Sequence, residues 1–178
     1  METFLSQIFP NPDERNYVLE KFAFALNETP ATAQFFIFVG NGANGKTTLL
    51  KLVSLGFGGY YVEIPVTVFT HQRPAANCPT PEFMAIRGKR VVTCSEANAK
   101  DTLNLCTIKC CTGENIMTGR GLFEKRLCTF YPQALFAMSV NQIPTIKSSA
   151  EDNGTWRRIS HVLFGSTFKE NPSDANEF

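Results

Sequence analysis

Short apolar runs recur along this chain, and segments with helical spacing of apolar positions lie between several of them. The runs occupy residues 35–39, 60–64, 91–96, 133–140 and 159–164. Each run is bounded by glycine, proline or polar residues, which predicts a strand. Helical spacing predicts helices over residues 13–26, 48–55, 81–87 and 98–112. The length and this alternation suit one compact domain with its own core.

Several segments lack these patterns. Residues 66–81 hold three prolines and little periodicity, which predicts a long loop. Residues 114–127 alternate in character on both sides of Gly119-Arg120-Gly121, which predicts a β-hairpin with a longer loop and with this tripeptide at its tip. Shorter segments predict a linker at 27–33, a turn at 152–155 and a polar, frayed tail at 165–178.

The loop after the first apolar run carries the one motif that specifies its own chemistry. Gly40-x4-Gly45-Lys46-Thr47 follows a predicted strand and precedes a predicted helix, as a phosphate-binding loop requires. Backbone N–H groups of such a loop surround phosphate oxygens, while Lys46 would reach the β and γ phosphates and Thr47 would bind Mg²⁺. The sequence therefore predicts binding of a nucleoside triphosphate such as ATP. The predicted nucleotide-binding residues are Gly40, Asn41, Gly42, Ala43, Asn44, Gly45, Lys46, Thr47 and Thr48.

Polar residues at the ends of later segments are candidates for the chemistry that follows binding. Glu96 ends a predicted strand, where a fixed carboxylate orders magnesium or activates the attacking water, although such a residue is often simply solvated. Asn141 also follows a predicted strand, and its amide could hold the lytic water or a γ-phosphate oxygen, or form an ordinary turn. Arg157 and Arg158 could neutralise charge on a γ phosphate or belong to a salt-bridged surface.

The predicted hairpin offers contacts for nucleic acid. Arg120, Lys125 and Arg126 supply cations for phosphates, and Phe123 supplies an aromatic face for base stacking. The alternative is an ordinary surface hairpin with Phe123 packed underneath.

Composition narrows the class of protein. Lys plus Arg is 17 against 16 for Asp plus Glu, so any contact with nucleic acid must come from a local patch. The six cysteines lack paired C-x-x-C spacing and the two histidines are isolated, so no zinc site is expected. The sequence has neither a signal peptide nor a long apolar stretch. We therefore expect a soluble intracellular protein with reduced thiols and no membrane contact.

Four motifs stand in one order along the chain. They are GNGANGKT, VVTCSEAN, TGENIMTGRGLFEK and SVNQIPTIKSSAEDNGTWRRI. In this series the chain resembles the ATPase core of superfamily 3 helicases, and most of all the primase–helicase proteins of large DNA viruses, phages and plasmids. The resemblance covers residues 35–164. It implies an AAA+-like α/β fold with a parallel sheet between helices, and a hexameric ring that hydrolyses ATP with Mg²⁺ to translocate on single-stranded DNA.

The resemblance also implies a role for each candidate. Lys46 and Thr47 would hold ATP and Mg²⁺, Glu96 would activate water, and Asn141 would sense the γ phosphate. One of Arg157 and Arg158 would be the finger that reaches a neighbouring subunit's site. The hairpin would be the pore loop that grips DNA, with Arg120 and Lys125 as preferred contacts and Phe123 as stacking face.

The same resemblance suggests how the chain is divided into domains and which partners it binds. Residues 1–34 would be a helical, collar-like segment, residues 35–164 the ATPase domain and residues 165–178 a tail. A primase domain or protein would be a partner, at a site of viral or mobile-element DNA replication. The chain departs from many relatives at one point, because Ser95 stands where they have the first of two consecutive acids. Magnesium would then depend on Thr47 and water, and Glu96 could both bind the cation and activate water or do only one of the two.

Two other functions fit part of the sequence. A small-molecule kinase would explain the phosphate loop and the size, but it leaves the hairpin and the segment from Asn141 to Arg158 without a role. An assembly module that binds nucleotide without efficient turnover would agree with Ser95 in place of an acid.

Overall fold

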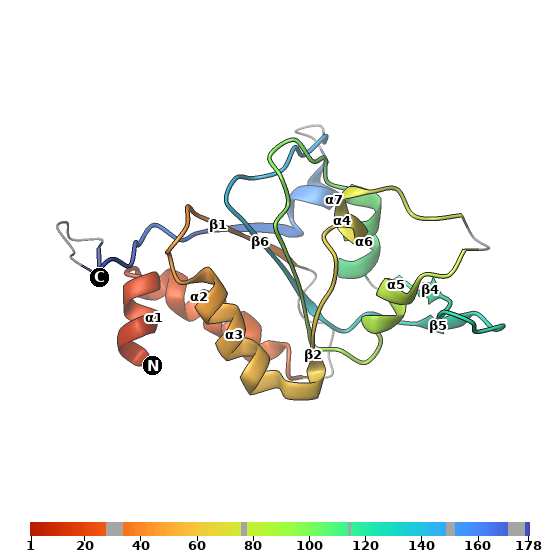
Figure 1. Ribbon diagram of the computed structural model, residues 1–178, viewed down its shortest axis with the longest axis horizontal. Helices are drawn as coiled ribbons and strands as arrows, with labels where there is room; N and C mark the ends of the chain where they lie inside the picture. Colours follow the sequence, from red (N-terminus) through yellow and green to blue (C-terminus); the bar gives the residue numbers. More distant parts are fainter. Residues whose placement is uncertain (28–33, 76–77, 114, 149–151, 171–176) are drawn as a thin grey trace.

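The computed structural model describes residues 1–27, 34–75, 78–113, 115–148, 152–170 and 177–178. Its central sheet has five parallel strands in the order β2-β3-β6-β1-β7 (Figure 1). The strands are β1 (Phe35–Val39), β2 (Tyr61–Glu63), β3 (Val91–Ser95), β6 (Leu135–Val140) and β7 (Ile159–Leu163). Each of the five predicted strands is therefore confirmed, with ends shifted by at most two residues.

Helices cover both faces of this sheet, because successive strand residues point to opposite sides. Phe36 and Phe38 of β1 lie in a buried cluster with residues of three helices: α1 (Glu2–Ile8), α2 (Pro12–Phe24) and α3 (Lys46–Phe57). Phe35 and Ile37 lie in a second cluster with α4 (Thr67–Thr70), α5 (Pro81–Ala85) and α6 (Leu105–Thr112). Figure 1 shows the two groups of helices on opposite sides of the sheet. The expected α/β sandwich is confirmed.

The short helices differ most from the sequence-based expectation. α4 lies within the predicted loop at 66–81, because Val68 and Phe69 are buried and draw this segment onto the sheet. α6 begins at Leu105 and not at residue 98, since the Asn104 side chain caps it by accepting a hydrogen bond from Thr107 N at 3.2 Å. The predicted turn at 152–155 is the start of a short helix, α7 (Asn153–Trp156), and a one-turn helix, η1 (Gly58–Tyr60), precedes β2.

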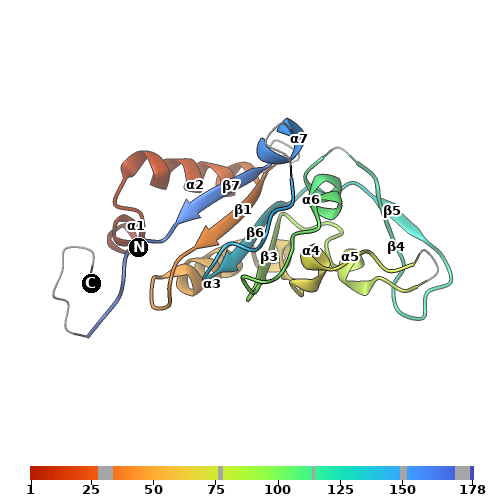
Figure 2. The ribbon, with the colours of Figure 1, turned by 90° about the horizontal axis from the view of Figure 1, so that it is seen from above.

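The predicted hairpin exists, but its turn is elsewhere. β4 (Met117–Gly119) pairs antiparallel with β5 (Cys128–Phe130), so that residues 120–127 form the connecting loop. The Gly-Arg-Gly tripeptide spans the end of β4 and the start of this loop, and it does not form the tip of the loop. The reason is that Thr80 N donates a hydrogen bond to Arg120 O at 2.8 Å, which ties the tripeptide to the start of α5. Figure 2 shows the hairpin and the chain termini at opposite ends of the molecule.

The part of the tail that the structure describes is packed and not frayed. Ser166 is buried and its hydroxyl donates to Gln7 O at 2.5 Å. Phe168 N donates to Ala43 O at 2.7 Å, and the Phe168 ring packs beside Phe4 with centroids 6.0 Å apart. The tail therefore covers the outer side of the phosphate loop together with α1. Of the predicted features, the linker residues 28–33, loop residues 76–77, hairpin residue 114 and tail residues 171–176 lie outside the described residues.

Candidate functional site

The predicted phosphate loop joins β1 to α3 at the carboxyl end of the sheet. Gly45 has φ of +83°, a left-handed conformation that glycine adopts without strain. At Gly40 a Cβ would lie 2.3 Å from Asn44 Nδ2 and 2.5 Å from the carbonyl oxygen of Phe164. Both glycines are therefore required by the close path of the loop.

Two polar side chains are buried inside this loop. Lys46 is 6% exposed, and its ammonium donates to Gly40 O and to Asn44 Oδ1, the latter at 3.2 Å. Burial lowers the pKa of Lys46 from its usual value. The Asn44 side chain is 4% exposed, and its Nδ2 has no hydrogen-bond partner among the described residues. An orphaned N–H donor beside a buried cation fits a loop that binds an anion, because a phosphate oxygen would satisfy both.

A pocket of about 670 Å³ opens between this loop and the strand ends. Because the carboxyl ends of parallel strands meet at one edge, the topology brings together predicted residues from distant parts of the sequence. Lys46, Thr47, Glu96 and Asn141 all line the pocket. Its other lining residues are Gly42, Ala43, Asn44, Gly45, Thr48, Glu63, Ser95, Ala97, Asn98, Ser139 and Val140.

Glu96 occupies an unusual backbone position at the end of β3. Its φ is +68°, which is uncommon for a residue with a Cβ, and its N–H donates to Ser139 O at 3.2 Å. Such positions cost free energy and concentrate at functional sites. The side chain is exposed, and the residue lines the pocket. A solvent-accessible carboxylate on a defined backbone position is suited to accept a proton from water or to hold a hydrated cation.

The sequence analysis missed Glu63, which also lines the pocket. It is the last residue of β2, and Ser95 Oγ donates to Glu63 Oε1 at 3.0 Å. The signal in the sequence was an acid one residue before the end of the predicted strand at 60–64. The residue of β3 that lies beside Glu63 is set by the strand register, which the sequence alone does not show. No cluster of three or more histidine, cysteine or acidic residues that could hold a metal exists among the described residues. The oxygens of Thr47, Glu63 and Glu96 nevertheless suit Mg²⁺, which takes one or two carboxylates plus phosphates and water.

The two candidate arginines lie at the other end of the sheet. β7 pairs with β1 in parallel, from Phe35↔Ile159 to Val39↔Leu163, so Arg157 and Arg158 precede the amino end of the strand. Neither lines the pocket, which lies a full strand length away. The Arg158 guanidinium donates to Gly154 O, whereas Arg157 is exposed.

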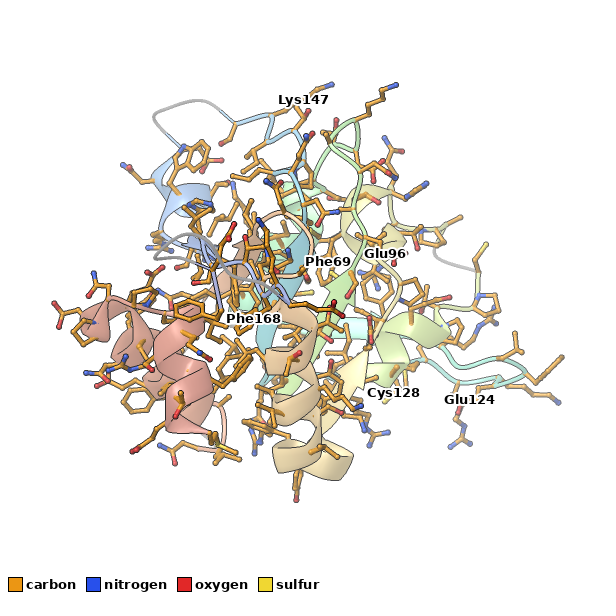
Figure 3. All side chains as sticks on the ribbon, turned by 60° about the vertical axis from the view of Figure 1, so that its left-hand side comes forward. Phe69, Glu96, Glu124, Cys128, Lys147 and Phe168 are labelled. Carbon is orange, nitrogen blue, oxygen red and sulfur yellow. The ribbon has the colours of Figure 1, made fainter. Side chains whose placement is uncertain are left out.

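The hairpin residues are placed unequally. Phe123 is 94% exposed and has φ of +63°, so the alternative in which it packs underneath the hairpin is wrong. Lys125 is also exposed, while Arg120 is half-buried at the base of the loop. None of the three lines the pocket, and Figure 3 shows Glu124 of the same loop well separated from Glu96.

Relatives of this chain are found among viral proteins that are named as helicases or primases. A protein named as a helicase in Acanthamoeba polyphaga mimivirus is 33% identical over 165 residues, which are 93% of this chain and 17% of that protein. A protein named as a primase in African swine fever virus is 28% identical over 175 residues, or 98% of this chain and 18% of that protein. A protein named as a helicase in Frog virus 3 is 29% identical over 168 residues, 93% of this chain and 17% of that protein.

Solved structures agree on the fold. The C-terminal region of NrS-1 matches with a TM-score of 0.70 at 15% identity, covering 96% of this chain and 38% of that chain. The JCV helicase matches with a TM-score of 0.52 at 16% identity, and the match covers 90% of this chain and 43% of that chain. No protein-family model matches. The fold is therefore that of helicase domains, and the resemblance to helicases and primases of large DNA viruses is confirmed.

These comparisons also limit what the similarity covers. The chain spans less than a fifth of the length of the curated relatives described above, at 17% and 18%.

Within the part of the chain that the structure describes, none of the helices combines the length and the apolarity that crossing a bilayer requires.

Proposed function

We propose that this chain is the ATP-hydrolysing motor domain of a replicative DNA helicase of superfamily 3. The observation that carries the proposal is the pocket at the carboxyl end of the sheet. It combines a phosphate loop that holds a buried lysine with Glu96 and Asn141 from two other strands. A phosphate loop alone would support nucleotide binding only, whereas an acid and an amide facing it supply the groups that hydrolysis needs.

Each residue of the pocket has a distinct task in this proposal. Bound Mg²⁺–ATP supplies the phosphoanhydride and the cation that neutralises its charge. Lys46, with the loop N–H groups, holds the β- and γ-phosphate oxygens, and the Thr47 hydroxyl faces the cation. Glu96 accepts the proton of the attacking water, because its carboxylate is exposed to solvent at the rim. Asn141 orients that water or a γ-phosphate oxygen from the end of β6.

The site is completed by a neighbouring subunit. Arg157 and Arg158 cannot serve the pocket of their own chain, since β7 separates them from it. A ring in which the amino end of one sheet faces the pocket of the next would bring an arginine to the γ phosphate in trans. Arg157 is the preferred finger, because it is exposed while the Arg158 guanidinium is engaged by Gly154 O. We propose a hexamer, by analogy with the family that the chain resembles.

The hairpin contacts single-stranded DNA in this arrangement. Lys125 and Arg120 would face phosphates, and the exposed ring of Phe123 would stack on bases. Residues 1–34 would act as a collar that helps the ring to form, and a primase domain or protein would accompany the motor at viral DNA replication. These assignments are supported by the exposure of the hairpin loop and by relatives that are named as primases.

The experiment that tests the function is ATP hydrolysis by the purified chain, with and without single-stranded DNA, over a range of protein concentrations. Lys46→Ala should abolish turnover, because the buried cation facing the phosphates is lost, whereas Lys100→Ala at an exposed position after β3 should not alter it. Turnover that rises with DNA and with protein concentration is the expected result. Nucleotide binding without turnover under all these conditions would favour the assembly module, for which Ser95 in place of an acid is the supporting observation.

A further inference from the structure

We propose that the Glu63 carboxylate, oriented by Ser95, is a second acid of the pocket and holds the hydrated Mg²⁺ that accompanies the nucleotide. This inference rests on the proposed function, because it assigns a further residue to the same site. It concerns a side chain on the edge strand β2, far from the other acid, Glu96, in the sequence.

The position of Glu63 is fixed by strand pairing. β2 pairs with β3 in parallel, with Glu63 beside Thr93, and Ile64 N donates to Thr93 O at 2.9 Å immediately after the strand. The Glu63 side chain leans along the strand direction toward Ser95, whose hydroxyl donates to Oε1 at 3.0 Å. This hydrogen bond occupies one carboxylate oxygen and leaves Oε2 available.

Glu63 and Thr47 line the same two spaces. Both line the pocket beside the phosphate loop, and both line a smaller cavity of about 210 Å³ to which residues of α3 also contribute. Thr47 is the hydroxyl that the phosphate-loop motif assigns to Mg²⁺. A carboxylate that lines the same two spaces is therefore placed to contact the water shell of a cation bound by Thr47, and Mg²⁺ characteristically keeps several of its waters.

The charge of Glu63 is not used elsewhere in the described structure. Among the described residues it takes part in no ion pair, and its one side-chain hydrogen bond is the neutral one from Ser95. An exposed serine hydroxyl does not require a carboxylate partner, since water would satisfy it equally well. A negative charge held toward a phosphate-binding pocket repels the nucleotide unless a cation lies between them. The arrangement is favourable only with the metal present.

This dependence on the metal provides the test. Affinity for a slowly hydrolysed ATP analogue is measured in excess Mg²⁺ and in excess EDTA, for the chain and for Glu63→Gln. In Mg²⁺ the variant should bind about tenfold more weakly, as is typical when a group that supports a metal is removed. In EDTA it should bind equally well or better, because a negative charge facing the phosphates is gone. Glu170→Gln, the same change at an exposed position outside the pocket and outside residues 1–34, is the matched control and should follow the unchanged chain in both conditions.

A second readout follows the metal itself. Mn²⁺ replaces Mg²⁺, and the electron paramagnetic resonance signal of free Mn²⁺ is recorded in the presence of the analogue. Glu63→Gln should leave more Mn²⁺ free at each concentration. Adding Ser95→Asp to Glu63→Gln places a carboxylate next to the lost one, because Ser95 Oγ lies 3.0 Å from Glu63 Oε1, and should restore most of the Mn²⁺ binding.

The outcomes separate this inference from the proposed function. If the unchanged chain binds no nucleotide, or binds it without any help from Mg²⁺, the proposed function is overturned together with the role of Glu63. If the unchanged chain shows the Mg²⁺ effect and Glu63→Gln shows it undiminished, only the role of Glu63 is overturned. Equal weakening in Mg²⁺ and in EDTA would identify a structural role and would likewise overturn it. A double variant that binds Mn²⁺ no better than Glu63→Gln would count against the need for a carboxylate here.

Discussion

The two ends of the central sheet present charge in opposite ways. At the carboxyl end, Lys46 and Asn44 are almost fully buried, and a turn of backbone surrounds them. At the amino end, Arg157 precedes β7 with its side chain exposed, and the hairpin that leads into β6 exposes Lys125 and Phe123. The carboxyl end buries a lysine and an amide before any ligand arrives, whereas the amino end exposes Arg157, Lys125 and Phe123 to solvent.

This difference indicates two kinds of recognition. A buried, pre-oriented cation and N–H donors suit a small anion that enters a pocket, because little conformational entropy is lost on binding. Exposed side chains lose more entropy when they bind, so they suit a large partner that supplies many contacts at once. A second subunit and a DNA strand are partners of that kind. The comparison predicts that substitutions at the carboxyl end act within one chain, and those at the amino end act between molecules.

The largest effect that would test this division is expected at Arg157. Arg157→Ala should lower DNA-stimulated turnover by a factor on the order of 10³ to 10⁵, the range associated with an arginine finger. Mixing Arg157→Ala subunits with Lys46→Ala subunits should restore part of the turnover, because some boundaries then combine an intact pocket with an intact arginine. Turnover of the mixture is measured against each variant alone.

The control for this experiment is Arg87→Ala, which removes another exposed arginine and should keep full turnover. Mixtures in which Arg158→Ala replaces Arg157→Ala show which arginine acts. If neither mixture exceeds its separate components, the site is not shared between subunits, and the amino end of the sheet does not have the role that the comparison assigns to it.

A smaller effect is expected at the hairpin. Lys125→Ala should spare turnover without DNA, since Lys125 does not line the pocket, and should weaken binding of single-stranded DNA. Each lost phosphate contact reduces the slope of log affinity against log salt concentration by about 0.7 for single strands. Fluorescence anisotropy over a range of salt concentrations measures the slope. Lys100→Ala, in the loop after β3, should leave it unchanged. An unaltered slope for Lys125→Ala would remove the hairpin from the DNA interface.

The sequence predicted the strands better than the segments between them. The run at 35–39 is buried on both faces, and such continuous apolar runs are a signal that tertiary context reinforces. α4 could not be predicted in the same way, because a one-turn helix has too few residues for periodicity and forms only when Phe69 packs on the sheet. The hairpin loop was misplaced for a similar reason, since a hydrogen bond from Thr80 fixes Arg120 across a long stretch of sequence.

At the candidate site too, the sequence predicted the residues that local patterns mark and missed those that depend on contacts distant in the sequence. Lys46, Thr47, Glu96 and Asn141 were found because each belongs to a motif or ends a predicted strand, and they line one pocket. Glu63 lies one residue before the end of a predicted strand, but nothing local links it to Ser95. Only the parallel register of β2 and β3 brings the two side chains within 3.0 Å. The sequence likewise could not predict that Phe168 packs on the phosphate loop, because this contact depends on the path of the tail after β7.

The smallest effect is expected at Asp152, which supports the arginines of the amino end through α7. Its carboxylate accepts hydrogen bonds from Thr155 N at 3.1 Å and Thr155 Oγ1 at 2.7 Å, and it pairs with Lys109 Nζ at 2.7 Å. Lys109 first, and then Thr155, hold the pKa of the Asp152 carboxyl well below its usual range. Since the folded pKa is depressed, the charged form stabilises the fold above the unfolded pKa of about 3.9, and this contribution disappears as pH falls toward the folded pKa.

Asp152→Asn, which keeps a cap oxygen but removes the charge, should therefore lower Tm slightly at pH 7. The difference from the unchanged chain should narrow as pH falls from about 5 to about 2. Thermal unfolding followed by circular dichroism measures it, and Lys109→Gln, which removes the same ion pair, should behave alike. A Tm difference that is constant over this pH range would mean that the charge of Asp152 does not stabilise α7. A loss of DNA-stimulated turnover in Asp152→Asn at unchanged Tm would instead mean that Asp152 acts by orienting Arg157 toward the neighbouring subunit.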